Sequence, residues 1–199
     1  MSRVSRIKQV TSWNRVLNAA RKTVGKEPFP EDKEPSVTWK NKILRAEHSP
    51  IRLLEYDISW EDLKQWVTVH LTRHHEGCEK FVHSQRGDRR ELDVPRDELP
   101  QGSLNDMDMT CNAQALINIS RKRLCNCASL ETREAWRQVK TEIENIDPET
   151  AAAMVPECIY RGFCPELKTC GWYRTEAAQK ALKEYRSIYG NEDRQIKVC

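Results

Sequence analysis

The sequence predicts one domain of mixed helix and strand, an α/β fold in the broad sense that includes α+β architectures. The length of 199 residues suits one domain of ordinary size. Apolar residues recur at three- and four-residue spacing in several segments, which is typical of amphipathic helices. Residues 51–58 instead follow a proline and have the short apolar character of a strand. Helices packed around a small sheet are therefore expected.

Helices are expected wherever this spacing is bounded by capping residues or by proline. A connector at 25–35, with three prolines, follows the opening helix, and His48-Ser49-Pro50 ends the next one. Ser59 and Ser129 are expected to cap two longer helices. Residues 77–100 are expected to be irregular or extended. The expected helices cover residues 13–23, 39–47, 60–75, 111–124, 130–146 and 175–189.

Composition excludes several classes of protein. The 33 basic and 30 acidic side chains give a net charge of +3, too low for a protein that coats duplex nucleic acid. No apolar run approaches the roughly 18 residues of a membrane span, and the first ten residues lack the apolar segment of a signal peptide. We therefore expect a cytoplasmic protein whose partners include neither a membrane nor a nucleic-acid duplex.

Polar groups stand out on the helix predicted over 111–124. Its apolar stripe has Asn112 and Arg123 at its edges, so both side chains are expected to be partly buried. Gln114 and Asn118 lie one turn apart on the opposite side. The helix thus offers amides to one neighbour and a guanidinium to another. The alternative is an ordinary capped helix with a surface arginine.

A second polar group ends the helix predicted over 60–75. Arg73-His74-His75 stands there, and Ser84 and Arg86 follow in the irregular segment. An arginine fork matches a phosphate bidentately and a serine hydroxyl adds a donor, so these residues could form an anion pocket. The alternative is simple capping, because a helix C-terminus favours cations. Zinc binding by the histidines is not expected, because adjacent cations would repel the ion.

The eight cysteines are expected to be reduced thiols, or ligands of a metal or cluster, rather than disulfides. Five of them could supply thiolates to zinc or to an iron–sulfur cluster, although none of the spacings is C-x-x-C. Buried free thiols are the commoner outcome, so we expect no metal site. These cysteines are Cys125, Cys127, Cys158, Cys164 and Cys170.

The order of these motifs resembles the flavin-dependent thymidylate synthases over roughly residues 13–140. The tract from Arg96 to Arg123 is the most specific, since several spaced positions agree. The matching segments are Asn18-Ala19-Ala20-Arg21-Lys22-Thr23, Ser49-Pro50, Arg73-His74-His75 with Ser84-Gln85-Arg86, and Arg96-x-x-Leu99-Pro100 with Asn112-Ala113-Gln114-x-Leu116 and Arg123.

The resemblance implies helices packed on a mostly antiparallel sheet, assembled as a homotetramer. It implies residues 1–150 as the family-like domain and residues 151–199 as a cysteine-containing extension packed on it. The implied reaction moves a one-carbon unit from methylenetetrahydrofolate to C5 of dUMP, with reduced FAD as hydride donor and NADPH as co-substrate. Two alternatives stay open: a related flavoprotein acting on another pyrimidine nucleotide, and a non-catalytic nucleotide-binding protein.

The resemblance also assigns residues by position. Arg123 would lie against the pyrimidine and stabilise negative charge on it, as the catalytic group. The residues implied for dUMP are His70, Arg73, Ser84, Gln85, Arg86, Arg96 and Arg123. Those implied for FAD are Ser49, Arg73, His74, His75, Asn112, Gln114 and Asn118.

The sequence departs from the family pattern mainly in the flavin half of the implied site. A glutamate and a tyrosine of the motif are replaced by Val82 and Gly87, so a carboxylate is lost. Gln114 replaces an arginine of the family motif, and Arg52 replaces an acidic residue. This suggests that Arg52 binds a phosphate in place of the arginine lost at position 114. Further substituted positions are Glu47, His70 and His75.

Overall fold

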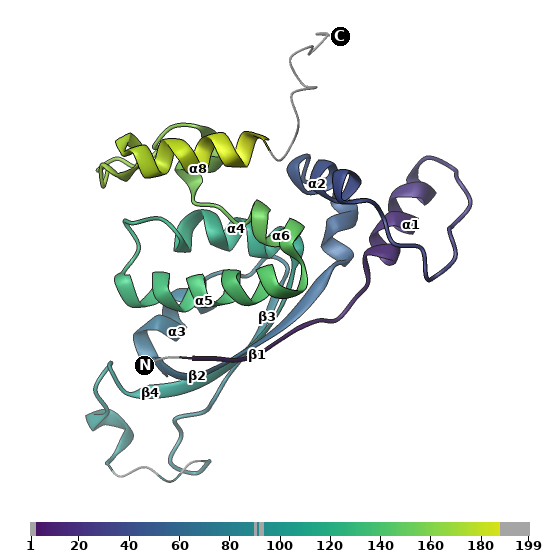
Figure 1. Cartoon of the computed structure of the whole chain (residues 1–199). Coiled ribbons are helices and arrows are strands. Elements are labelled where there is room, and N and C mark those ends of the chain that lie inside the picture. The colour runs from purple at the N-terminus through teal and green to yellow at the C-terminus, as the bar shows by residue number, and fades with distance from the viewer. Residues whose placement is uncertain (1–2, 90, 92–93, 188–199) are drawn as a thin grey trace.

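The computed structural model describes residues 3–89, 91 and 94–187, and it has one four-stranded antiparallel sheet. Strands β1 and β2 pair at one side, β2 pairs with β4, and β4 pairs with β3, so that the order is β1-β2-β4-β3. Figure 1 shows helices stacked over one side of this sheet. The strands are β1 (Arg3–Gln9), β2 (Glu55–Lys64), β3 (Cys78–Val82) and β4 (Leu104–Asn112). The expected mixed fold with an antiparallel sheet is confirmed.

The two central strands have one buried face and one polar face. Along β2, Tyr56, Ile58 and Trp60 are buried and alternate with partly exposed neighbours. Along β4, Met107 and Met109 are buried in the same way. Alternate residues of a strand point to opposite faces, so this pattern places all five side chains under the helices. The remaining face of the central strands carries polar residues.

Eight α-helices and three short 3₁₀ turns are present in the described residues. In Figure 1, α3, α5 and α6 lie over the sheet, α1 and α2 lie beyond one end of it, and α8 lies outermost. The helices are α1 (Trp13–Thr23), α2 (Val37–Arg45), α3 (Gln65–Thr72), α4 (Ala113–Arg123), α5 (Leu130–Ile146), α6 (Pro148–Ala153), α7 (Glu157–Arg161) and α8 (Glu176–Ser187). The 3₁₀ turns are η1 (Ser49–Leu53), η2 (Arg96–Glu98) and η3 (Trp172–Arg174).

The main core lies between the sheet and α5. Trp60 of β2 stacks on Trp136 of α5 with ring centroids 6.3 Å apart, and both side chains are buried. Aromatic pairs of this kind add to the free energy gained from burial alone. A second, smaller apolar cluster joins α7 to α8 through Ile159 and Leu182. The expected division of the chain at residue 150 stays a prediction.

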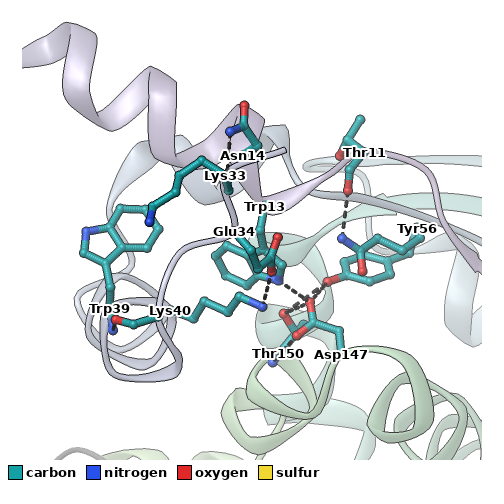
Figure 2. A network of polar contacts seen from close by, with 12 residues as sticks. Thr11, Trp13, Asn14, Lys33, Glu34, Trp39, Lys40, Tyr56, Asp147 and Thr150 are labelled. Atoms are coloured by element: carbon teal, nitrogen blue, oxygen red, sulfur yellow. Dashed lines mark hydrogen bonds and ion pairs between the residues drawn. The ribbon is translucent and has the colours of Figure 1, made fainter. Parts of the chain in front are cut away.

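A buried carboxylate ties three distant segments together (Figure 2). Asp147, which precedes α6, accepts hydrogen bonds from the indole of Trp13 at 2.9 Å and the phenol of Tyr56 at 2.5 Å. Thr150 donates to the same carboxylate from its hydroxyl at 2.9 Å and from its backbone N–H at 3.2 Å. Burial and the adjacent carboxylate raise the pKa of Tyr56 well above its usual value. The phenol therefore stays a donor at all ordinary pH values.

Two of the expected elements are present but start too early in the prediction. Residues 60–64 continue β2, and the helix begins only at Gln65, so Ser59 is a strand residue and not a cap. Residues 51–53 belong to the η1 turn, and the strand begins at Glu55. The spacing of Trp60 and Leu63 fits a helical stripe, and it also fits the buried face of a strand with a bulge between them. Pairing with β1 and β4 makes this part a strand.

The other expected helices are present, with shifted ends. Helix α2 begins two residues before the expected start, because the Ser36 side chain accepts from the N–H of Trp39. Helices α1, α4 and α5 match their predictions within two residues. The last helix runs to Ser187, and the predicted end at 189 lies outside the described residues. Strand β3 lies in the segment expected to be irregular or extended, whereas β1 and β4 have no counterpart among the expected elements. Within the described ranges, no helix has the length and apolar character that a bilayer crossing requires.

Candidate functional site

The N-terminus of α4 is built against Gly77. Asn112 is the N-cap, and its side-chain oxygen accepts from the N–H of Ala115 at 2.9 Å. Its own N–H donates to the carbonyl of Gly77 at 2.9 Å. Gly77 has φ +71°, and a Cβ at this position would lie 2.6 Å from the Asn112 amide. Both the backbone conformation and the close approach therefore require glycine.

A polar hollow of about 700 Å³ opens beside this contact. Within it, the Gln114 amide donates to Glu47 at 2.5 Å and to Asn118 at 3.3 Å. Glu47 also pairs with Arg121, whose guanidinium lies 3.6 Å from the ring centre of Tyr160. Its carboxylate is therefore already neutralised. The hollow is lined by Glu47, Arg52, Glu76, Gly77, Asn112, Gln114 and Asn118.

The C-termini of α3 and α4 meet through Arg123. Its Nε donates to Nε2 of His74 at 2.9 Å, and its Nη2 donates to the backbone carbonyl of His70 at 2.5 Å. Burial and the neighbouring guanidinium lower the pKa of His74 to about 4, so the ring is neutral and carries its proton on Nδ1. Burial and Arg73 also lower the pKa of Arg123. The guanidinium is thus held by neutral acceptors alone.

No acidic group balances this charge. In the described parts of the chain, neither Arg73 nor Arg123 forms an ion pair with a carboxylate. A guanidinium has five N–H donors, and the contacts to His74 and His70 use two, which leaves three. We call Arg73, Arg123, His70 and His74 the cation cluster. Such a set of unbalanced charges with spare donors favours an anionic ligand.

The ring of His70 faces α5, while its backbone carbonyl faces Arg123. Its Nδ1 lies 2.9 Å from the hydroxyl of Thr132, and its ring meets that of Trp66 edge-on at 5.6 Å. Burial, Arg123 and Arg73 lower the pKa of His70. The nucleotide contact expected of His70 stays a prediction, and the residue already holds Arg123 through its carbonyl.

The predicted phosphate-binding residues lie on the connection between β3 and β4. Arg86 makes a bidentate pair with Asp88, at 2.9 and 2.7 Å, and both side chains are exposed. The hydroxyl of Ser84 accepts from the N–H of Arg86 at 3.2 Å. The amide of Gln85 donates to the hydroxyl of Ser103 at 3.2 Å. Asp88 was not expected in this role, because no spacing rule marks an acid two residues after an arginine as its partner.

This connection lies apart from Arg123. Its base is fixed at the first turn of α3, where the N–H of Gln65 donates to the backbone carbonyl of Ser103 at 2.8 Å. Arg123 instead contacts the C-terminal part of α3, through the carbonyl of His70. Figure 1 shows the connection projecting beyond the sheet, on the side away from α4. Arg96 lies on it, exposed, in η2. Among the described residues, no hydrogen bond or ion pair joins Arg86 or Arg96 to Arg123.

The predicted flavin residues fall into neighbouring groups. Asn112, Gln114 and Asn118 line the polar hollow, and the turn 73–77 joins it to the cation cluster. His75 is exposed on that turn. Ser49 lies on the other side of η1, in a separate hollow of about 640 Å³. Arg52, from the same turn, faces the polar hollow.

Comparison with solved structures identifies the architecture. A UMP/dUMP methylase, PolB, from Streptomyces cacaoi, bound with 5-Br dUMP, matches with a TM-score of 0.59 and 16% identity, over 79% of this chain and 95% of that one. The flavin-dependent thymidylate synthase ThyX from Helicobacter pylori, complexed with FAD and dUMP, matches with a TM-score of 0.59 and 13% identity, over 77% of this chain and 99% of that one. The chain has the ThyX-like fold. No protein-family model and no curated protein matches its sequence.

Proposed function

We propose that this chain is a ThyX-like enzyme that modifies C5 of a pyrimidine nucleotide of the dUMP type. The observation that carries the proposal is the cation cluster, in which Arg123 keeps three unused donors and no carboxylate partner among the described residues. The fold supports it, since two proteins with this architecture were solved with dUMP or 5-Br dUMP. The reference reaction is transfer of a one-carbon unit from methylenetetrahydrofolate.

Arg123 is the proposed catalytic group. A cation against a uracil ring favours the ionised base, and the negative charge raises the electron density at C5, where carbon is accepted. Because Arg123 is held by a neutral imidazole and a carbonyl, its charge is directed at the ligand and not cancelled inside the protein. No cysteine or other side-chain nucleophile is required.

The polar hollow fits FAD. It offers side-chain amides, the exposed backbone of Gly77, and the guanidinium of Arg52, which has no carboxylate partner in the ranges 3–89, 91 and 94–187. Glu47 is already neutralised by Arg121, so it does not repel a pyrophosphate. FAD, when bound, would supply hydride, and NADPH would be its reductant. The proposed FAD contacts are Ser49, Arg52, Arg73, His74 through Nδ1, His75, Asn112, Gln114 and Asn118.

The nucleotide phosphate would be held by Ser84, Gln85, Arg86 and Arg96. These residues and Arg123 are separated within one chain, so a complete site needs a second copy that brings its β3–β4 connection to the cation cluster. This supports the proposed homotetramer. The polar open face of the sheet leaves surface for such assembly. A phosphate would also have to replace Asp88 as the partner of Arg86.

One observation favours a related substrate over dUMP itself. The family has a glutamate where this chain has Val82, an apolar and partly buried residue of β3. The proposed nucleotide site therefore lacks one carboxylate acceptor. A pyrimidine nucleotide with a different ring or sugar, such as UMP, is the second candidate. The PolB neighbour is described as acting on both nucleotides.

Titration calorimetry with dUMP, UMP and FAD tests the proposal on the purified chain. Arg123→Ala should weaken nucleotide binding by about 30-fold or more, since loss of one partner of a desolvated charge pair costs roughly 2–5 kcal/mol. Arg137→Ala removes an exposed arginine of α5 and serves as the matched control. A colourless protein that shows no FAD binding with dUMP present, and equal nucleotide affinity in both variants, would refute the proposal.

A further inference from the structure

Two buried cysteines lie directly opposite each other on neighbouring strands. Cys78 begins β3, Cys111 is the last residue but one of β4, and the strand register pairs the two. Directly opposed residues point their side chains to the same face of a sheet. Here that face is the buried one, since Cys78 is 5% exposed and Cys111 is 0% exposed. Both are free thiols, and the site described above uses neither.

The backbone hydrogen bonds show which kind of antiparallel pair the two cysteines form. Pairs that exchange hydrogen bonds alternate along the ladder with pairs that do not. The N–H of Asn112 donates to the carbonyl of Gly77 at 2.9 Å, so a bonded pair lies next to Cys78 and Cys111. The cysteines are therefore a non-hydrogen-bonded pair, a kind in which the two Cα atoms lie about 4.5 Å apart. A disulfide requires a Cα separation of roughly 4.4–6.8 Å, which this pairing satisfies.

The two thiols are in contact and differ in reactivity. They hydrogen bond to each other, and this bond, together with the charge of Lys80, lowers the pKa of Cys78. Burial raises the pKa of Cys111 well above its usual value. The thiolate is the form that attacks an oxidant. Cys78 is thus the thiol that reacts first, and Cys111 supplies the second sulfur.

The pair adjoins the polar hollow. Cys78 follows Gly77 and Cys111 precedes Asn112 in the chain, and both of these neighbours line the hollow. A bond between the two sulfurs would therefore fix the strand ends that hold Gly77 against the N-cap of α4.

We propose that Cys78 and Cys111 are an oxidation site, at which hydrogen peroxide converts the two thiols into a reversible cross-strand disulfide. The Cys78 sulfur attacks one peroxide oxygen, the O–O bond breaks, and the second oxygen leaves with the thiol proton as water. The Cys111 sulfur then attacks the sulfenic acid on Cys78, and its hydroxide leaves with the Cys111 proton as a second water. Two thiols thus lose two electrons, which reduce one peroxide to two waters. A dithiol reductant reverses the step.

Peptide mapping of the full-length protein tests the proposal without a variant. The reduced protein is treated with hydrogen peroxide in native buffer, its remaining thiols are blocked, and it is digested with trypsin without reductant. Cleavage after lysine and arginine leaves Cys78 as the sole cysteine of residues 74–80 and Cys111 as the sole cysteine of residues 97–121. A joined mass of these two peptides that is lost on reduction supports the proposal. Two separate blocked peptides, or a disulfide from either peptide to another cysteine, overturn it.

Variants test the order of the two steps. Cys111→Ala leaves the sulfenic acid on Cys78 without a second thiol, so dimedone should label Cys78 in this variant. Cys111 should stay unlabelled in Cys78→Ala. Cys158→Ala removes a buried thiol of α7 and is the matched control, in which the disulfide should still form. Label on Cys111 in place of Cys78, or loss of the disulfide in the control, contradicts the proposal.

Thermal unfolding measures whether the native pair accommodates the bond. The oxidised chain should melt about 5–10 °C above the reduced one, because a cross-link restricts the unfolded chain. The rise should be absent in Cys111→Ala. An oxidised chain that melts below the reduced one would overturn the proposal, since the bond would then distort the pair. These readouts are masses and melting temperatures, so the result does not depend on the proposed function.

Discussion

The imidazole of His74 accepts a hydrogen bond from the guanidinium of Arg123 at 2.9 Å, between residues 49 positions apart in the chain. The contact joins the end of α3 to the end of α4. It fixes the ring in one tautomer and leaves the guanidinium fully charged. The geometry thus keeps an arginine partly buried without an acid to neutralise it.

Stability should fall as the pH is lowered from 6.5 toward 4, through His74. Its pKa is about 4 in the folded protein and near 6.5 when unfolded, so the unfolded chain takes up the proton first. Because the ring is only partly buried, we expect a loss of about 1–2 kcal/mol over this range. Urea unfolding at pH 7, 6 and 5 measures the effect. His74→Gln should reduce the pH dependence, and an identical profile for both proteins would contradict the assignment.

Release of Arg86 from Asp88 should strengthen nucleotide binding. Asp88→Ala removes the carboxylate that occupies both arms of the guanidinium. A phosphate could then bind both N–H groups of the Arg86 guanidinium without competition from a carboxylate. We therefore expect about 3- to 10-fold tighter dUMP binding that is more sensitive to salt. Calorimetry at two salt concentrations measures this. Glu142→Ala, an exposed acid on α5, controls for net charge. Equal affinity in the two variants would exclude Arg86 from the phosphate site.

The Asp147 network should contribute strongly to stability. Asp147→Ala leaves the donors of Trp13, Tyr56 and Thr150 buried without their acceptor. We expect a loss of about 3–5 kcal/mol in the free energy of unfolding. Tyr56→Phe removes one donor only and should cost about 1–2 kcal/mol. Chemical denaturation compares the two variants. A loss under about 1 kcal/mol for Asp147→Ala would show that the network is not a main support of the fold.

Gly77→Ala should disturb the polar hollow more than a glycine substitution elsewhere. A Cβ there meets the Asn112 amide at 2.6 Å, in addition to the cost of φ +71°. Gly25 has φ +68° and open space around it, so Gly25→Ala isolates the backbone cost of about 1 kcal/mol. We expect Gly77→Ala to lose a further 1 kcal/mol or more, and to weaken FAD binding. Equal losses of stability in both variants would mean that Asn112 moves aside freely.

The sequence predicts those elements whose stability is local. Helices α4 and α5 have amphipathic stripes, and both are found where expected, although only α4 has a side-chain cap and the hydroxyl of Ser129 contacts that of Thr132 instead. The spacing of Trp60 and Leu63 fits a helix or a bulged strand, and only pairing with β1 and β4 makes residues 60–64 a strand. Strands β1 and β4 depend on partners far along the chain, which no local pattern reveals.

The same distinction applies to the candidate site. The row of Gln114 and Asn118 on one face of α4 follows from helical spacing, and the structure places both in the polar hollow. The partners that restrain the site could not be foreseen. Glu47 meets Arg121 across 74 positions, a contact that depends on how the segment between α2 and η1 lies against α4. The pairing of Arg86 with Asp88 depends on the path of an exposed connection.

The buried carboxylate of Asp147 also constrains how the protein is made. During synthesis Tyr56 emerges 91 residues before Asp147, and Trp13 emerges 134 residues before it. Until the acceptor arrives, the indole and phenol have no buried partner, and the helical layer cannot close over the sheet. A chain that stops before residue 147 would present aromatic surface and unpaired donors together. Such a product would be a natural target for chaperones and proteases.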